Sequence, residues 1–185
     1  MALGSNQRRV VSKQELDAAR ARFVAAWGQM GATWGISRTM AEIHALLYIR
    51  GEPLNTDEIM DELSISRGNA SMSLRSLVEW GIVSRVHKRG DRKEYFQAEQ
   101  DVWALCRTII RERLRREIHP LMTALFEVRD MTQGAGGSAE GVSEHNKRMD
   151  DLLELMQMID RLGERFVGSD GRGLRLAASV LSKVP

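Results

Sequence analysis

The residues from 65 to 97 have the types and spacing that point most directly to chemistry, because they read as a polar cationic helix, a strand, a basic glycine turn and a second strand. Seven Lys and Arg stand between Arg67 and Lys93 against two acidic side chains, so this segment carries a net charge of +5, whereas the whole chain carries +2. A local excess of positive charge is typical of surfaces that bind polyanions. The order of these elements predicts the recognition helix and wing of a DNA-binding winged helix.

The predicted recognition helix spans residues 66–80. Its apolar residues recur at helical spacing and predict one buried stripe, made of Ala70, Leu74, Leu77 and Val78. Ser66 is expected to cap the N-terminus, and Gly81 is expected to end the helix in the left-handed conformation. The remaining face is polar enough to enter a major groove, and it carries Arg67, Asn69, Ser71, Ser73, Arg75 and Ser76.

The predicted wing spans residues 82–97 and reverses at Gly90-Asp91, a pair that suits a tight hairpin turn. Its tip is strongly basic. Arg92 has an alternative, structural role, because an Arg beside Asp91 can hold the wing together.

The candidate DNA contacts divide into two groups. Base edges are assigned to Asn69, Ser71, Met72 and Arg75, with Met72 against a thymine methyl. Phosphates, or the minor groove for a wing arginine, are assigned to Arg67, Lys88, Arg89, Arg92 and Lys93. The first turn of the helix, with Ser66, Arg67, Gly68 and Asn69, also offers free N–H groups to phosphate.

A further helix is predicted upstream, from Asn55 to Leu63, with a cap at its N-terminus. Helix, turn, helix, strand, wing and strand in this order favour a winged helix over the simpler reading, a solvated charged face on an ordinary helical protein. The fold alone does not fix the ligand, since winged helices also bind protein or RNA.

Several short motifs, spread over roughly residues 20 to 105, resemble the GbsR branch of the MarR-type transcriptional regulators. The resemblance implies a homodimeric repressor or activator that binds near-palindromic DNA. The C-terminal helices resemble the family in pattern only. The motifs are Trp27-Gly28, Met30-Gly31, Trp34 to Arg38, Leu46-Leu47-Tyr48, Glu52-Pro53-Leu54, Ser66 to Arg75 and Gly90 to Phe96.

The whole chain is expected to be mainly α: a winged helix-turn-helix with a two-stranded β wing, plus long C-terminal helices for dimerisation. We predict a loose arm over residues 1–12, a winged-helix domain over 13–100 and a helical region over 101–185. Outside the helix-turn-helix and wing, the expected helices are Lys13 to Gly28, Ser37 to Arg50, Asp101 to Arg129 with a kink at His119-Pro120, Ser143 to Phe166, and a short one from Gly173 to Lys183. Residues 133–141 have the composition of a flexible linker.

The helix predicted from Ser143 to Phe166 carries an apolar stripe long enough to need a partner. Core or dimer packing is favoured over an adaptable, Met-rich ligand pocket. If two chains pair about a two-fold axis, each recognition helix meets a successive major groove, about 10 base pairs apart, so the operator should be pseudo-palindromic.

Control by a small-molecule effector is a further expectation. Its candidate site is an aromatic cage for a quaternary ammonium group, the ligand that the resemblance suggests; packing is the commoner role of such aromatic residues. The candidate cage residues are Trp27, Trp34, Trp80, Phe96 and Trp103. Redox sensing through Cys106 is a rival mode of control, and a protein-interaction scaffold that never reads DNA is the alternative of a different class.

Catalysis, cofactors and metals are not indicated. The four histidines, His44, His87, His119 and His145, show no metal-ligand spacing, and no phosphate-binding glycine loop is present. His44 is expected to be a satisfied core residue. No apolar run is long enough to cross a membrane, and residues 1–9 lack the apolar segment of a signal peptide, so we expect a cytoplasmic protein without a membrane partner. A single cysteine excludes an internal disulfide.

Overall fold

The computed structural model describes residues 11–132 and 141–168, which form two compact units divided between Gln100 and Asp101. Most of the predicted N-terminal arm, nearly all of the linker predicted over 133–141 and the helix predicted from Gly173 to Lys183 lie outside the described residues.

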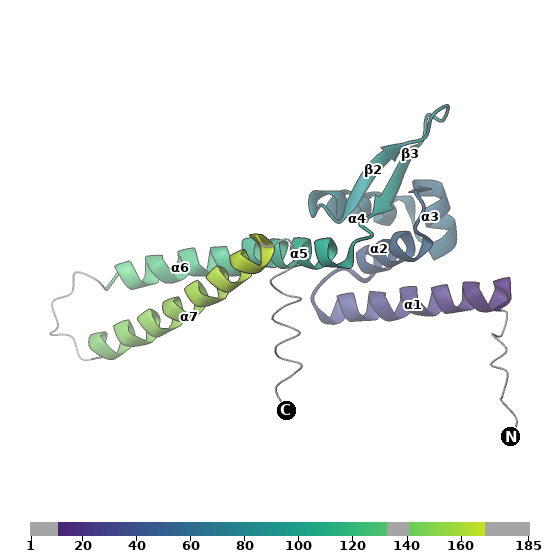
Figure 1. Ribbon diagram of the computed structural model, residues 1–185. Coiled ribbons are helices and arrows are strands. Elements are labelled where there is room, and N and C mark those ends of the chain that lie inside the picture. Colours follow the sequence, from purple (N-terminus) through teal and green to yellow (C-terminus); the bar gives the residue numbers. More distant parts are fainter. Residues whose placement is uncertain (1–10, 133–140, 169–185) are drawn as a thin grey trace, which may run out of the picture. The chain divides into compact units, whose positions relative to one another are not determined.

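The first unit is a winged helix-turn-helix, as predicted (Figure 1). Three helices precede the recognition helix: α1 (Lys13–Thr33), α2 (Arg38–Arg50) and α3 (Thr56–Leu63). The recognition helix is α4 (Arg67–Glu79), and the wing is formed by β2 (Val83–His87) and β3 (Glu94–Ala98). Figure 1 shows β2 and β3 projecting as a ribbon beyond α3 and α4.

The sheet holds one strand more than predicted. Strand β1 (Leu54–Asn55) pairs antiparallel with β3, so the order is β1-β3-β2, and Leu54 stands opposite Phe96. A strand of two residues carries no readable alternation, which is why periodicity missed it. Its effect is to tie the start of α3 to the inner strand of the wing.

Local capping explains where helices α2 and α3 begin. Asn55 caps α3 by accepting hydrogen bonds from the backbone N–H groups of Asp57 and Glu58, while the Glu58 carboxylate accepts from the Asn55 N–H. This reciprocal capping box satisfies donors that a helix start leaves unpaired. Ser37 caps α2 in a simpler way, and Gly51 ends that helix with a φ of +69°.

Helix α1 continues through Gly28, where the sequence predicted its end. A Cβ at Gly28 would lie 2.5 Å from Glu42 Cγ, and one at Gly31 would lie 2.5 Å from Ala41 Cβ. Both glycines therefore permit close packing of α1 on α2 and do not terminate the helix. A glycine with this packing role reads the same in sequence as a helix stop.

The core of the first unit lies around α2. Its largest fully buried side chains come from α2, α3 and α4, and they are Ile43, Leu47, Ile59, Leu74 and Leu77. On α2 the side chains of Met40, Ile43, Leu46 and Leu47 recur at helical spacing and are buried.

His44 lies in this core, only 3% exposed, between the rings of Trp27 and Tyr48. The prediction of a buried histidine is confirmed, but that of a satisfied one is not, because its Nε2 atom has no hydrogen-bond partner among the residues that the structure describes. Burial lowers the pKa of His44 to about 4, since an apolar environment disfavours the charged imidazolium.

The second unit consists of α5 (Val102–Arg113), a π-helical turn η1 (Leu114–Ile118), α6 (His119–Asp130) and α7 (Val142–Gly168). The irregularity predicted at His119-Pro120 takes the form of this π turn, which joins α5 to α6. Helices α6 and α7 lie side by side (Figure 1), and Arg129 on α6 forms an ion pair with Asp150 on α7 at 2.7 Å. Within the described ranges, no helix is long and apolar enough to cross a membrane.

Candidate nucleic-acid interface

The recognition helix α4 is fixed at both ends by local chemistry. Ser66 Oγ accepts a hydrogen bond from the Asn69 N–H at 3.3 Å, as expected for the cap. At the other end Gly81 adopts a φ of +73°, and the N–H groups of Gly81 and Ile82 donate to the carbonyls of Val78 and Leu77. These bonds form a Schellman motif, which confirms the predicted glycine cap.

One residue of the predicted polar face is misplaced. Ser73 is only 8% exposed and lies on the buried side of α4 with Ala70, Leu74 and Leu77. The spacing of these four residues places them on one helical face. The polarity of Ser73 suggested the outer face of the helix, whereas its spacing indicates the buried face. Ser73 is not available to DNA.

Ser76 is half-buried, and the rest of the outer face of α4 is as predicted. Ser66, Arg67, Gly68, Asn69, Ser71, Met72 and Arg75 are all exposed. Met72 is 72% exposed, an unusual place for a large apolar side chain on a polar helix face. A thymine methyl group is a partner that would cover it.

The wing turns at Gly90, with a φ of +87°, and Asp91 holds the turn together. The Asp91 carboxylate accepts hydrogen bonds from the Lys93 N–H at 2.9 Å and from the Tyr95 hydroxyl at 2.6 Å. These bonds keep the pKa of Asp91 low, with the Tyr95 hydroxyl as the largest cause. Among the described residues the Arg92 side chain forms no ion pair with Asp91, so Tyr95 has the structural role considered for Arg92.

Two further cations of the wing are held by neighbours. The Lys88 ammonium lies 3.9 Å from the centre of the Tyr95 ring, a cation–π contact. Arg85 on β2 pairs with Glu94 on β3 at 3.1 Å across the hairpin. Both pairs hold the positive charge close to the strands.

Asp57, in the first turn of α3, contacts two of the predicted phosphate ligands. Its carboxylate accepts a hydrogen bond from the Arg67 guanidinium at 2.6 Å and lies 3.3 Å from the Lys93 ammonium. The hydrogen bonds from Lys93 and then Arg67 lower the pKa of Asp57, and the same bond to Asp57 raises the pKa of Lys93. An acidic side chain thus joins α3, α4 and the wing within the basic surface.

Sequence reasoning missed this role of Asp57. The only signal was an acidic residue in the first turn of the helix before the recognition helix, and such residues usually complement the helix dipole.

The cations of the surface therefore differ in their freedom. Arg67, Lys93, Arg85 and Lys88 each contact an acidic or aromatic side chain. In the part of the chain that the structure describes, Arg75, Arg89 and Arg92 form no ion pair. These three arginines can reach a polyanion without first giving up another partner.

The candidate aromatic cage does not gather in the first unit. The ring of Trp27 packs on Phe23 and His44 at centroid distances of 5.7 and 6.0 Å, Phe96 is 4% exposed in the sheet, and Trp103 belongs to the second unit. A groove of about 520 Å³ runs between α1, α2 and α3, but its walls hold none of the five cage residues. The cage stays a prediction.

Comparison with known proteins gives a consistent set of matches. A family model described as the MarR family matches residues 34–94, which begin after α1 and end at the first residue of β3. The HTH-type transcriptional repressor GbsR of Bacillus subtilis is 29% identical over 94 residues, which cover 51% of this chain and 52% of that protein. This chain thus spans about half the length of that relative.

Two other matches extend further. The HTH-type transcriptional regulator MmpR5 of Mycobacterium tuberculosis is 31% identical over 121 residues, which cover 64% of this chain and 68% of that protein. A solved structure titled "Crystal Structure of a transcriptional regulator" superposes with a TM-score of 0.57 at 22% identity, and covers 81% of this chain and 96% of its own. At that identity the likeness concerns the fold alone.

Proposed function

Since this chain belongs to the MarR family of transcriptional regulators, we propose that it is a homodimer that reads a pseudo-palindromic DNA operator. The observation that carries the proposal is the exposed polar face of α4 beside a basic wing, in a helix whose opposite face buries Ala70, Leu74 and Leu77. A helix with this division of faces can lie in a major groove without disturbing its own core.

Base readout is assigned to the exposed middle of α4. Arg75 has no competing ion pair among the described residues, so its guanidinium is available to O6 and N7 of a guanine. Met72 is assigned to a thymine methyl, and Asn69 and Ser71 to hydrogen bonds with neighbouring base edges.

Phosphate contacts are assigned to the wing and to the start of α4. Arg89 and Arg92 extend from the hairpin tip without partners among the described residues, whereas Arg67 and Lys93 would exchange Asp57 for phosphate. Lys88 can contact phosphate while its ammonium remains near the Tyr95 ring. Contacts of this kind fix the register of the protein on the duplex and make its affinity depend on salt.

Homodimerisation is supported by the second unit, where large apolar side chains remain exposed. A soluble helical pair normally buries such residues, and a second copy offers a matching surface. The exposed residues are Leu121, Phe126 and Val128 on α6, Met131 directly after it, and Leu155, Met158, Ile159 and Leu162 on α7.

Repression is the mode of regulation that the relatives favour, since GbsR and OpcR of Bacillus subtilis are both named repressors. A dimer bound over a promoter would exclude polymerase by occupying the same DNA. A small-molecule effector that changes the spacing of the two reading heads is the form of control that we propose with it.

The test is fluorescence anisotropy with the DNA upstream of the chain's own gene and with a scrambled duplex of equal length, at several salt concentrations. We expect the upstream DNA to bind at least about a thousandfold more tightly. The logarithm of the affinity should fall linearly with the logarithm of salt concentration, with a slope that indicates several phosphate contacts.

The other outcomes are informative in different ways. Equal, salt-steep binding to both duplexes would contradict an operator in the upstream DNA and would call for selection of a site from random sequence. Absence of binding to any duplex in that selection would overturn the proposal in favour of a protein-interaction scaffold.

A further inference from the structure

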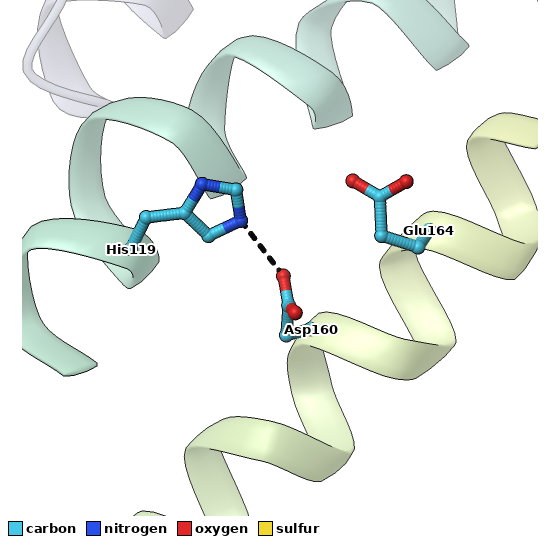
Figure 2. A group of neighbouring side chains, drawn as sticks. All are labelled: His119, Asp160 and Glu164. Atoms are coloured by element: carbon cyan, nitrogen blue, oxygen red, sulfur yellow. Dashed lines mark hydrogen bonds and ion pairs between the residues drawn. The ribbon is translucent and has the colours of Figure 1, made fainter. Parts of the chain in front are cut away.

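Three side chains that can bind a metal ion meet in the second unit. Figure 2 shows His119, at the start of α6, facing Asp160 and Glu164 on α7. One ligand atom from each of the three lies within 4.8 Å of the others, and His119 Nε2 is 2.9 Å from an Asp160 carboxylate oxygen. Sequence reasoning found no ligand spacing, because 41 residues separate His119 from Asp160.

The helix backbone next to His119 is irregular. Directly before His119, the π turn η1 places the His119 N–H on the carbonyl of Leu114, five residues earlier. Widened turns of this type often occur at functional sites. Pro120 follows within the helical run that continues from α5, and because proline has no N–H it leaves one backbone hydrogen bond of that run unmade.

Gly163 has a matching role on α7. A Cβ at Gly163 would lie 2.5 Å from Leu114 Cδ1, so a larger residue there would force the Leu114 side chain to move. Leu114 itself is buried. Gly163 lies between Asp160 and Glu164 in the sequence, so α7 is close to Leu114 next to the two carboxylate ligands.

The charges in the cluster are unbalanced. Asp160 shares a hydrogen bond with His119, but Glu164 forms no hydrogen bond or ion pair among the described residues. The two carboxylates are four residues apart on one helix, an arrangement in which like charges repel. A cation bound between them would reverse that repulsion.

We propose that His119, Asp160 and Glu164 bind one divalent transition-metal ion. Ligands at about 2.1 Å from an ion stand roughly 3.0 to 3.4 Å apart, close to the present distance between His119 Nε2 and Asp160. Rotation about the side-chain bonds of Glu164 brings in the third ligand. The ion replaces the hydrogen bond between His119 and Asp160, and neutral imidazole supplies the nitrogen.

The donor set selects the class of ion. One imidazole nitrogen with two carboxylate oxygens suits Mn²⁺, Fe²⁺, Co²⁺, Ni²⁺ or Zn²⁺, whereas Mg²⁺ and Ca²⁺ prefer oxygen ligands alone. Three protein ligands leave positions for water. The site joins α6 to α7 and does not depend on DNA binding by the first unit.

The experiment uses the full chain after treatment with a chelator. Zn²⁺ is titrated by calorimetry, and Co²⁺ is followed by its visible absorption bands, which report ligand geometry. We expect one ion per chain and a thermal unfolding midpoint that rises with Zn²⁺ concentration, because binding to the folded state alone stabilises it.

Variants locate the ion. Glu164→Gln should weaken Zn²⁺ binding by at least about tenfold, since loss of even an outer partner of a metal ligand costs that much. Glu154→Gln, the same change at another exposed position of α7, should leave the affinity unchanged, and His119→Gln should abolish the Co²⁺ bands while His145→Gln preserves them.

Failure to bind either ion would overturn the proposal, as would equal affinity in wild type, Glu164→Gln and His119→Gln, which would place the metal elsewhere. If His119→Gln does not fold, Glu164→Gln decides, because Glu164 supports no described contact whose loss could unfold the chain.

Discussion

The α4 and wing region of the first unit contrasts with the α6 and α7 pair of the second. In α4 the apolar side chains Ala70, Leu74 and Leu77 are buried, Val78 is half-buried, and the outer face is polar apart from the exposed Met72. In α6 and α7 the pattern is incomplete: α6 has no buried residue among those described, and α7 buries only Leu153 and Met156. In the first region the apolar face of the helix is covered by the core, whereas in the second large apolar side chains remain exposed.

Breaking the second region should have the largest effect. Leu162 on α7 is 59% exposed, and Leu162→Asp should produce a monomer because it places a charge in the proposed dimer interface. Loss of the second half-site should weaken operator binding by a hundredfold or more, an order of magnitude set by effective concentration. Light scattering and fluorescence anisotropy measure the two effects.

Lys147→Asp, which introduces the same side chain at an exposed polar position of α7, should remain dimeric. A Leu162→Asp protein that stays dimeric would show that the pairing surface lies elsewhere.

The exclusion of water from the core of the first unit can be tested through His44. Its folded pKa of about 4 lies below the unfolded value of 6.5, so the unfolded chain binds a proton more readily. Stability is fully present above pH 6.5 and declines as the pH falls toward 4, by about 3 kcal/mol in total. Urea unfolding at pH 7 and pH 4.5 should show a much smaller decline in His44→Phe.

The control is His87→Phe, because His87 is exposed on the wing and should leave the pH dependence intact. An identical decline in wild type and His44→Phe would mean that water reaches the His44 ring.

The assignment of Arg75 to a base and of Arg92 to a phosphate can be tested by comparing two variants of the first region. Arg75→Ala should remove preference at one base position of each half-site, about 1–3 kcal/mol of discrimination. Arg92→Ala should weaken all sequences alike and reduce the salt slope by about one. Anisotropy over a set of singly substituted operators distinguishes the two, and an unchanged salt slope in Arg92→Ala would remove it from the phosphate contacts.

The smallest effect is expected at Asp57. Asp57→Asn removes a negative charge from the basic surface and releases Arg67 and Lys93, so DNA should bind about two to five times more tightly, the scale of exposed ion pairs. Asp61→Asn, on the same helix but without a described ion pair, should change the affinity less. Weaker binding in Asp57→Asn would mean that Asp57 mainly orients the two cations.

The sequence by itself determined where the recognition helix and the wing begin and end, and in which order they follow. The cap at Ser66, the glycines at 81 and 90 and the apolar phase of α4 are local signals, because each acts within a few residues of the backbone that it shapes. The bounds of α4 and of the wing therefore agree with prediction to within two residues. The helical spacing of Ser73 also predicts its inward position, although its polarity alone suggests the outer face.

The tertiary structure decided what lies between elements. Strand β1 forms only because β3 is there to pair with it, and α1 passes through Gly28 only because α2 packs against that glycine. Asp57 meets Lys93 across 36 residues of chain, and His119 meets Asp160 across 41. Contacts at that separation depend on how whole helices and strands pack, and the spacing of residues along the chain does not contain that information.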